Sequence, residues 1–219
     1  MLPLRDVIPS RTTPYVTVTL IVLNGLAWFY EVFMPREQLA VFLQAYGVVP
    51  AAFIPSTLLT SMFLHGGWSH VIGNMWYLWI FGDNVEDRLG HGRFVVFYLL
   101  CGIVAAFGQI LMNPESTLPT IGASGAIAGV MGAYVVLYPH SRVLTLIPLI
   151  IYWEIIELPA IFLLGFWFLM QLFSAGAIAV TASTGGGGVA FMAHVAGFLA
   201  GVLGVFVFKR KQRPDVRWA

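Results

Sequence analysis

The sequence predicts an all-α membrane protein with six transmembrane helices and a long, partly helical first loop. Of the 219 residues, 59% are apolar and only 10% are charged. A soluble domain usually carries about a quarter charged residues and less than about half apolar ones. So little charge cannot cover a water-exposed surface, and the apolar excess must therefore face lipid.

Six apolar segments approach the roughly 20 residues that a transmembrane helix needs. They lie near Tyr15–Phe33, His70–Leu89, Phe94–Leu111, Ser124–Tyr138, Ile156–Gly176 and Val189–Phe208. The fourth segment is short if it begins at Ser124. Either this helix begins a little earlier, or the serine lies below the membrane surface on a helix that does not span fully.

The six segments form one membrane domain at residues 15–208. A polar cytoplasmic tail is predicted at 1–14, and a basic cytoplasmic tail at 209–219. The first apolar segment is too long for the apolar region of a signal peptide, and no small-residue cleavage site follows it. We therefore expect it to remain as a helix.

Three connections between the spans are long or unusual in composition. Glu31–Ser69 contains apolar pieces broken by prolines, and we predict a partly helical loop at the membrane interface. A loop of this length is more often functional than passive. Arg142–Glu154 is predicted to be an interfacial loop, because Pro148 interrupts a run shorter than a span. Thr181–Gly188, with four consecutive glycines, is predicted to be a flexible connection.

The basic residues predict the orientation. With six spans and a cytoplasmic N-terminus, every lysine and arginine except Arg36 falls on the cytoplasmic side, as the positive-inside rule expects. We therefore predict a multi-pass protein of a prokaryotic plasma (inner) membrane with both termini in the cytoplasm. The net charge of +1 gives no indication of nucleic-acid binding. The lipid bilayer is the expected partner, and no oligomeric state is predicted.

Polar side chains inside apolar segments are candidate functional groups, because burying them in lipid is costly. For His194, a hydrogen bond to a backbone carbonyl is as good an explanation as a functional role. For Ser124 alone, packing of a small residue is the better one. His70 and Asn74 share one helix face, where they could simply bond to another helix. A metal site at His65 and His70 is disfavoured, because no zinc-binding pattern is present. No metal or cofactor is predicted.

Taken together, these residues indicate a serine nucleophile with its base. A serine needs a general base within hydrogen-bond reach to attack at neutral pH. Its side chain is short, so the helices carrying Ser124 and His194 must approach more closely than the usual 8–10 Å or so. Glycines at four-residue spacing allow this, and they are present as Gly125 and Gly129 on one helix and Gly197 and Gly201 on the other.

The other catalytic groups follow from the same reasoning. No acidic residue lies well inside a predicted span, so a Ser–His dyad is expected in place of a triad. A packed or neutral group would then have to orient the imidazole. The side chains of Asn74 and His70 can donate hydrogen bonds to an oxyanion. The backbone N–H of Ser124 can do so too if this residue begins a helix.

Four blocks of the sequence occur in a characteristic order. They are His65-Gly-Gly-Trp-Ser-His70 with Asn74, then Glu86-Asp-Arg88, then Gly122-Ala-Ser-Gly125, then Ala193-His-Val-Ala-Gly-Phe-Leu-Ala-Gly201. In order and in placement on spans two, four and six, they resemble the rhomboid family of intramembrane serine proteases. The resemblance covers nearly the whole chain, from Tyr15 to Phe208.

The resemblance implies an endopeptidase that cuts single-span or multi-span membrane proteins in or near their transmembrane segments. Ser124 would be the nucleophile and His194 the general base and acid, with Asn74 and His70 in the oxyanion hole. Glu86 and Arg88 would be structural.

One departure from the family concerns the residue one turn after the serine. Many members carry an aromatic residue there, packed against the histidine, and this chain has Ala128. Another residue must then hold His194, and Phe191 is a candidate.

Two other functions are open at this point. A non-catalytic rhomboid relative would bind transmembrane segments without cutting them, although such a protein would normally lack the serine or the histidine. A small transporter would use the polar residues as a relay. Against a transporter, no internal repeat is visible, and no acid or lysine lies deep in a span.

Overall fold

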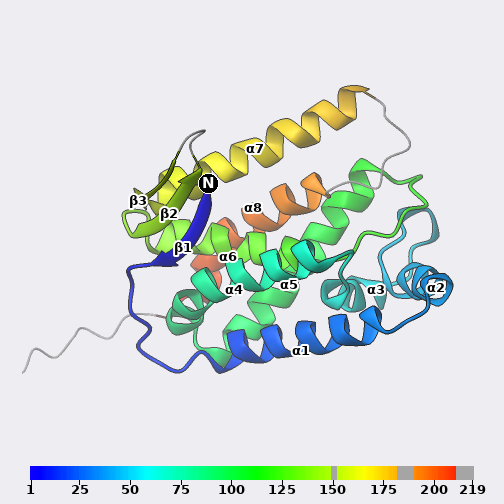
Figure 1. The fold of residues 1–219 in the computed structure, drawn as a ribbon, viewed down its shortest axis with the longest axis horizontal. Coiled ribbons are helices and arrows are strands. Elements are labelled where there is room, and N and C mark those ends of the chain that lie inside the picture. The colour runs from blue at the N-terminus through cyan, green and yellow to red at the C-terminus, as the bar shows by residue number, and fades with distance from the viewer. Residues whose placement is uncertain (149–151, 182–189, 211–219) are drawn as a thin grey trace, which may run out of the picture.

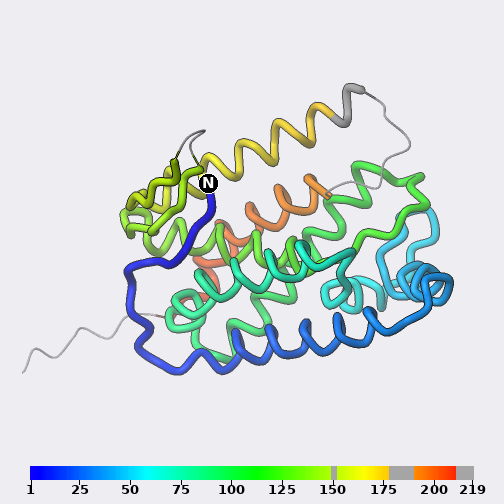
Figure 2. The backbone as a smooth tube through the Cα atoms, viewed as in Figure 1, coloured from blue at the N-terminus to red at the C-terminus, as the bar shows by residue number. Residues whose placement is uncertain are grey.

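The computed structural model describes residues 1–148, 152–181 and 190–210, most of which are helical. The elements in chain order (Figure 1) are β1 (Leu2–Asp6), α1 (Tyr15–Val32), α2 (Arg36–Tyr46), α3 (Thr57–Thr60), α4 (Trp68–Leu89), α5 (His91–Met112), α6 (Ser124–Leu137), β2 (Arg142–Pro148), β3 (Trp153–Pro159), α7 (Ala160–Thr181) and α8 (Phe191–Phe208). Short 3₁₀ helices lie at Pro50–Ala52 and Ser61–Phe63. The tube in Figure 2 shows the same course without the ribbon.

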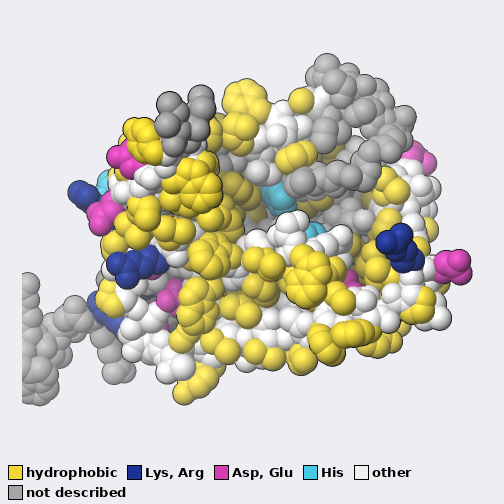
Figure 3. All heavy atoms as spheres, in the orientation of Figure 1, with side chains coloured by type: hydrophobic (Ala, Val, Ile, Leu, Met, Phe, Trp, Pro, Cys, Tyr) yellow, Lys and Arg dark blue, Asp and Glu magenta, His cyan; other side chains and the backbone are white. Residues whose placement is uncertain are grey.

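Among the described residues, four helices are long and apolar enough to cross a membrane: α1, α5, α7 and α8. The other two predicted spans do not meet that criterion. α4 has 22 residues but carries Asp83, Glu86, Asp87 and Arg88 in its last turns, and α6 has only 14 residues. In Figure 3, hydrophobic side chains cover the middle of the visible face and most charged ones lie toward its two ends, as expected for a bundle surrounded by lipid.

Helix α6 forms the centre of the bundle, and every residue from Gly125 to Tyr134 is buried. Its most extensive contacts are with α8, which runs parallel to it, and it also packs against α5 and α4. A side chain at Gly197 or Gly201 would overlap the backbone carbonyls of Gly125 and Gly129, respectively. The predicted close approach of these two helices through small residues is confirmed, because only hydrogen fits between their backbones.

The long first loop is partly helical, as predicted, and it supports the segment that leads into α6. Val48 and Thr120 exchange backbone hydrogen bonds of 3.0 and 2.8 Å. The backbone N–H of Gly122 donates to the carbonyl of Ser61 at 2.8 Å. The loop thus fixes the turn that immediately precedes Ser124.

The prediction of a purely α-helical chain is wrong near the C-terminal end of α6, the end away from Ser124. There β1, β2 and β3 form an antiparallel sheet in that order. Arg142–Glu154 was expected to be an interfacial loop, and the fifth span was expected from Ile156. Residues 142–148 and 153–159 are strands instead, and α7 begins only after Pro159. Burial alternates along part of β2, since Val143 and Thr145 are buried while Arg142 is exposed, as in a strand with one covered face.

The first turn of α1 and the segment before it are both attached to the end of α4 by carboxylates. Glu86 is fully buried and accepts hydrogen bonds from the backbone N–H groups of Val16 and Thr17 at 2.9 and 2.8 Å. These are N–H groups of the first turn of α1, which have no acceptor within the helix. Asp87 accepts from the backbone of Arg11 and Thr12 at 2.5 and 2.9 Å. Residues 1–14, predicted as a tail, are therefore largely bound to the bundle.

Two predictions fall mainly on positions for which no structure is described. Of the flexible connection Thr181–Gly188, residues 182–188 lie outside the described residues. Of the basic tail at 209–219, residues 211–219 do.

Candidate active site

Ser124 is the first residue of α6, so the helix does not begin earlier than the serine. Because it lies in the first turn, its backbone N–H has no acceptor within the helix and can serve a ligand. Gly122, two residues earlier, has a φ of +119°, a conformation that L side chains rarely adopt. This turn presents the partly buried Ser124 side chain to the space between α6 and α8.

His194 lies in the first turn of α8, with 8% of its surface exposed. Its Nε2 is 2.8 Å from the Oγ of Ser124, which is a normal hydrogen-bond distance. The close approach of α6 and α8 through their glycines makes this contact possible. The structure therefore brings the two predicted reacting groups within hydrogen-bond reach.

The second ring nitrogen of His194 has a partner that sequence reasoning missed. Its Nδ1 is 2.8 Å from the Oε1 of Gln171 on α7. One turn earlier on the same helix, the ring of Trp167 lies with its centroid 5.7 Å from that of His194, at an angle of 37°. Apart from the contact with Ser124, the described contacts of the His194 ring thus come from α7, and Phe191 is not among them. Gln171 is the only amide side chain in the predicted fifth span, and that was the available signal.

His70 and Asn74 lie on α4 and face the turn before Ser124. A β-carbon placed on Gly122 would be 2.6 Å from His70 Nε2 and 3.6 Å from Asn74 Nδ2. The Nδ1 of His70 lies 3.3 Å from the backbone N–H of Gly66, which donates to it. A neutral ring whose Nδ1 accepts must carry its proton on Nε2. His70 therefore presents an N–H donor to this turn, and all four predicted site residues lie around it.

A second layer of polar groups supports Asn74. Its Nδ2 lies 3.0 Å from the Nε2 of His65, and the Oε2 of Glu31 accepts from the backbone N–H of His65 at 3.1 Å. Burial, and secondarily the nearby His70, lower the pKa of His65 to about 4, so this ring is neutral at physiological pH and accepts from Asn74. The second amide hydrogen of Asn74 remains for a ligand. The role of Glu31, which is 1% exposed in the last turn of α1, was missed.

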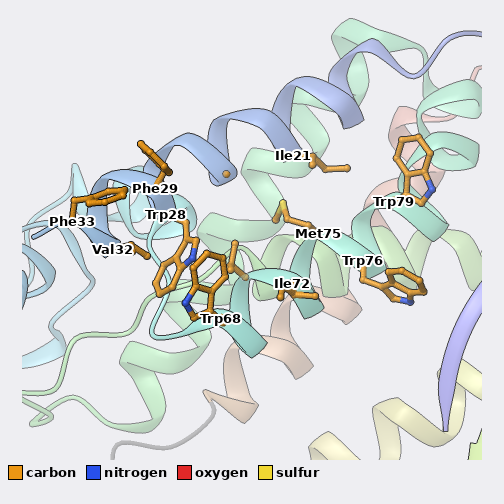
Figure 4. Close-up of a pocket in the computed structure, with 12 residues that line it drawn as sticks. Ile21, Trp28, Phe29, Val32, Phe33, Trp68, Ile72, Met75, Trp76 and Trp79 are labelled. Carbon is orange, nitrogen blue, oxygen red and sulfur yellow. The ribbon is translucent and has the colours of Figure 1, made fainter.

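An apolar groove of about 610 Å³ lies on another side of α4, against α1. Figure 4 shows its lining, which includes Trp28, Phe29, Trp68, Met75 and Trp79. The lining is almost entirely carbon, so the groove supplies neither a nucleophile nor a base. It is not the candidate reaction site.

The fold and the site describe a helical membrane protein in which a serine and a histidine meet within an apolar bundle. Residues 54–211, well over half of the chain, match the family model described as "Rhomboid domain". The chain therefore belongs to the rhomboid family. Family membership and the four long apolar helices make it an integral membrane protein.

Several curated proteins are similar to parts of this chain. "Rhomboid protease GluP" of Bacillus subtilis (strain 168) is 43% identical over 76 residues, which are 35% of this chain and 14% of that protein. "Rhomboid protein 1, mitochondrial" of Saccharomyces cerevisiae is 31% identical over 109 residues, 47% of this chain and 32% of that protein. "Presenilin-associated rhomboid-like protein, mitochondrial" of Mus musculus is 34% identical over 89 residues, which are 40% of this chain and 24% of that protein. Each match spans about a third or less of the relative's length.

Proposed function

We propose that this protein is an intramembrane serine endopeptidase that hydrolyses peptide bonds in or near transmembrane segments of other membrane proteins. The observation that carries this proposal is the 2.8 Å contact between Ser124 Oγ and His194 Nε2. A serine paired with a base in this way is the arrangement that acyl transfer requires. Similarity to a bacterial relative named as a rhomboid protease supports the same reaction.

In the proposed reaction, His194 Nε2 takes the hydroxyl proton of Ser124 as the Oγ attacks the substrate carbonyl carbon. The carbonyl oxygen becomes an oxyanion. When the C–N bond breaks, the imidazolium returns the proton to the leaving amine and an acyl-enzyme ester remains. Water, deprotonated by His194, then attacks the ester, and the serine hydroxyl is regenerated.

The oxyanion needs donors that are in place before the reaction begins. Three groups around the Gly122 turn qualify in this proposal. They are the free amide hydrogen of Asn74, the Nε2–H of His70 and the backbone N–H of Ser124. Both side chains are oriented by other contacts, Asn74 through His65 and His70 through Gly66, so little reorganisation is needed.

We propose membrane-spanning segments, from single-span or multi-span proteins, as substrates. The carbonyls of a transmembrane helix are already hydrogen-bonded within that helix, so a serine cannot attack until the segment unwinds locally. In lipid, each freed backbone group costs several kcal/mol unless it finds a partner. The polar groups around Ser124 offer such partners. Segments containing glycine or proline, which weaken helices by about 1 and 3 kcal/mol relative to alanine, should be cut fastest.

We further propose that α1, α4, α5, α6, α7 and α8 are six membrane spans and that both termini lie in the cytoplasm of a prokaryotic cell. The charge distribution supports this orientation. The sheet would then lie on the cytoplasmic side, and Ser124, at the other end of α6, would lie nearer the opposite surface.

The test of the proposed reaction uses purified protein in detergent with a single-span substrate. Ser124→Ala and His194→Ala should each abolish cleavage while the protein stays folded, and the double variant should be no worse than either, because the two residues act as a unit. A fluorophosphonate probe should label the wild type at Ser124 only. A folded wild-type protein that binds the substrate but neither cuts it nor takes up the probe would be a non-catalytic relative instead.

A further inference from the structure

The imidazole of His194, on α8, is contacted by side chains from two other helices, α6 and α7. The Nε2 faces Ser124 on α6 at 2.8 Å, and the Nδ1 faces Gln171 Oε1 on α7, also at 2.8 Å. The imidazole is thus held between a hydroxyl and an amide oxygen.

The two contacts determine where the imidazole carries its proton. An amide oxygen only accepts hydrogen bonds, so the Nδ1 that faces it must be the protonated nitrogen. In a neutral imidazole the other nitrogen then has a free lone pair. That lone pair is on Nε2, which faces the Ser124 hydroxyl. In the opposite tautomer, Nε2 would carry a proton and could not accept one from the serine.

The surroundings of Gln171 suggest a reason for its place on α7. The next residues, Leu172 and Phe173, have 46% and 72% of their surface exposed, and lipid would cover them. An amide on such a helix is costly unless it is hydrogen-bonded. In the structure, its oxygen meets that need through His194.

Trp167 adds a second constraint from the same helix. It lies one turn before Gln171 and packs its ring near that of His194. Ala128, one turn after Ser124 on α6, is fully buried and too small to do this. In this chain, α7 thus provides both a ring neighbour and a hydrogen-bond acceptor for His194.

We propose that Gln171 is a positioning residue that holds His194 in the Nδ1–H tautomer, with Nε2 directed at Ser124. This inference rests on the proposed peptidase function. Gln171 touches neither the substrate nor the serine, and it acts through the histidine alone. Gln171 is neutral, but it takes the place that an aspartate has in a triad.

The main experiment compares Gln171→Met, which keeps the length of the side chain but loses the amide oxygen, with Gln171→Glu, which keeps an acceptor. Losing the aspartate of a triad costs about 10⁴ in kcat. We expect a smaller loss for a neutral amide, because general-base catalysis as a whole contributes about 10²–10⁴ in rate. Gln171→Met should therefore lower kcat by about 10- to 100-fold. KM should change little. Gln171→Glu should remain within a few-fold of wild type. Leu172→Met, on the exposed side of the same turn, is the matched control.

The pH profile of kcat/KM provides a readout that a merely structural role would not move. A carboxylate beside the imidazole favours its charged form, so Gln171→Glu should shift the acidic limb to higher pH by about one unit or more. Among the described residues, His70 on α4 is the other titratable group whose charge would act on His194. It is present in all variants, so its effect cancels in the comparison.

A spectroscopic measurement works even if a Gln171 variant fails to fold. Nitrogen NMR of ¹⁵N-histidine-labelled wild-type protein, with His194 assigned by comparison with His194→Ala, reports which ring nitrogen carries the proton. We expect the proton on Nδ1. A proton on Nε2 would overturn the inference, as would normal kcat in Gln171→Met, or equal inactivation of folded Gln171→Met and Gln171→Glu.

Failure of this inference can be told apart from failure of the proposed function. If the wild type and Ser124→Ala are equally inactive and neither takes up the fluorophosphonate probe, the peptidase assignment is wrong. If the wild type cuts substrate and Gln171→Met cuts it equally well, only the role of Gln171 is wrong.

Discussion

Asn74 illustrates how a single side chain serves two partners. One of its amide hydrogens goes to the neutral ring of His65, and the other is free to meet an oxyanion. His65 is in turn held by Glu31 through its backbone N–H. The direction of the free hydrogen therefore depends on residues that do not themselves face the Gly122 turn.

We predict that Asn74→Ala lowers kcat by about 10²–10³, as loss of one oxyanion donor does elsewhere. KM should change little, because the oxyanion exists only near the transition state. Steady-state kinetics on a single-span substrate will measure both parameters, with Ser69→Ala, an exposed residue in the first turn of the same helix, as the control. Normal kcat with a raised KM would instead assign Asn74 to substrate docking.

At the scale of elements, the contact between α6 and α8 sets the distance between Ser124 and His194. The contact consists of glycines facing backbone carbonyls, Gly197 opposite Gly125 and Gly201 opposite Gly129. Backbone cannot move aside as the end of a side chain can. Any added carbon must therefore separate the helices.

We predict that Gly201→Ala destabilises the protein by about 1–3 kcal/mol, the usual cost of overpacking. It should also reduce cleavage, because His194 moves away from Ser124 as the helices separate. Unfolding in detergent and a cleavage assay will measure the two effects. Gly165→Ala on α7, where an added β-carbon meets nothing within 4 Å, is the control. Equal stability of the two variants would show that the α6–α8 contact tolerates a methyl group.

At the scale of the whole molecule, the N-terminal strand β1 links α4 to α6. The Oδ2 of Asp6 accepts from Tyr134 Oη on α6 at 2.6 Å and from Asn84 Nδ2 on α4 at 2.9 Å. The indole of Trp76, also on α4, donates to the carbonyl of Pro3 at 2.6 Å. Residues far apart in the chain thus connect the two helices that carry Ser124 and the oxyanion donors.

Burial raises the pKa of Asp6 to about 6, with the hydrogen bond from Tyr134 lowering it in part and nearby Asp83 raising it. A raised native pKa means that the folded protein holds this proton more tightly than the unfolded chain does. The stabilisation is therefore complete below about pH 4 and is lost as pH rises through about 6.

Because an asparagine side chain does not titrate, Asp6→Asn should gain stability relative to wild type between pH 4 and pH 7. Thermal unfolding of both proteins in detergent across this range will test it, and effects of the other titrating groups cancel in the difference. An identical pH dependence of the two proteins would contradict the prediction.

The proposed orientation can be tested with single cysteines at Ser10 and Glu37, which lie near opposite ends of α1. A membrane-impermeant maleimide added to intact cells should label the cysteine at 37 and not the one at 10, while cell lysis should expose both. The native Cys101 is buried at 3% exposure and serves as the unlabelled background. Labelling of position 10 in intact cells would invert the proposed orientation.

The sequence by itself determined the membrane class of the protein and the four residues proposed for the site. Lipid imposes the first, because apolar segments of about 20 residues have few alternatives. The site residues could be identified because each is polar in an apolar setting and follows a short local pattern, such as His70 and Asn74 on one helix face. The glycine spacing that brings α6 to α8 was readable for the same reason.

Only the tertiary structure decided which distant residues meet. Gln171 precedes His194 by 23 residues, and Asp6 precedes Tyr134 by 128, and no local pattern relates either pair. The strands were missed because β2 and β3 are short, and because β1, which pairs with β2, lies at the N-terminus, far from it in the chain. Their hydrogen bonds form between segments, whereas those of a helix form within one. Periodicity along the chain could therefore predict the helices and not the sheet.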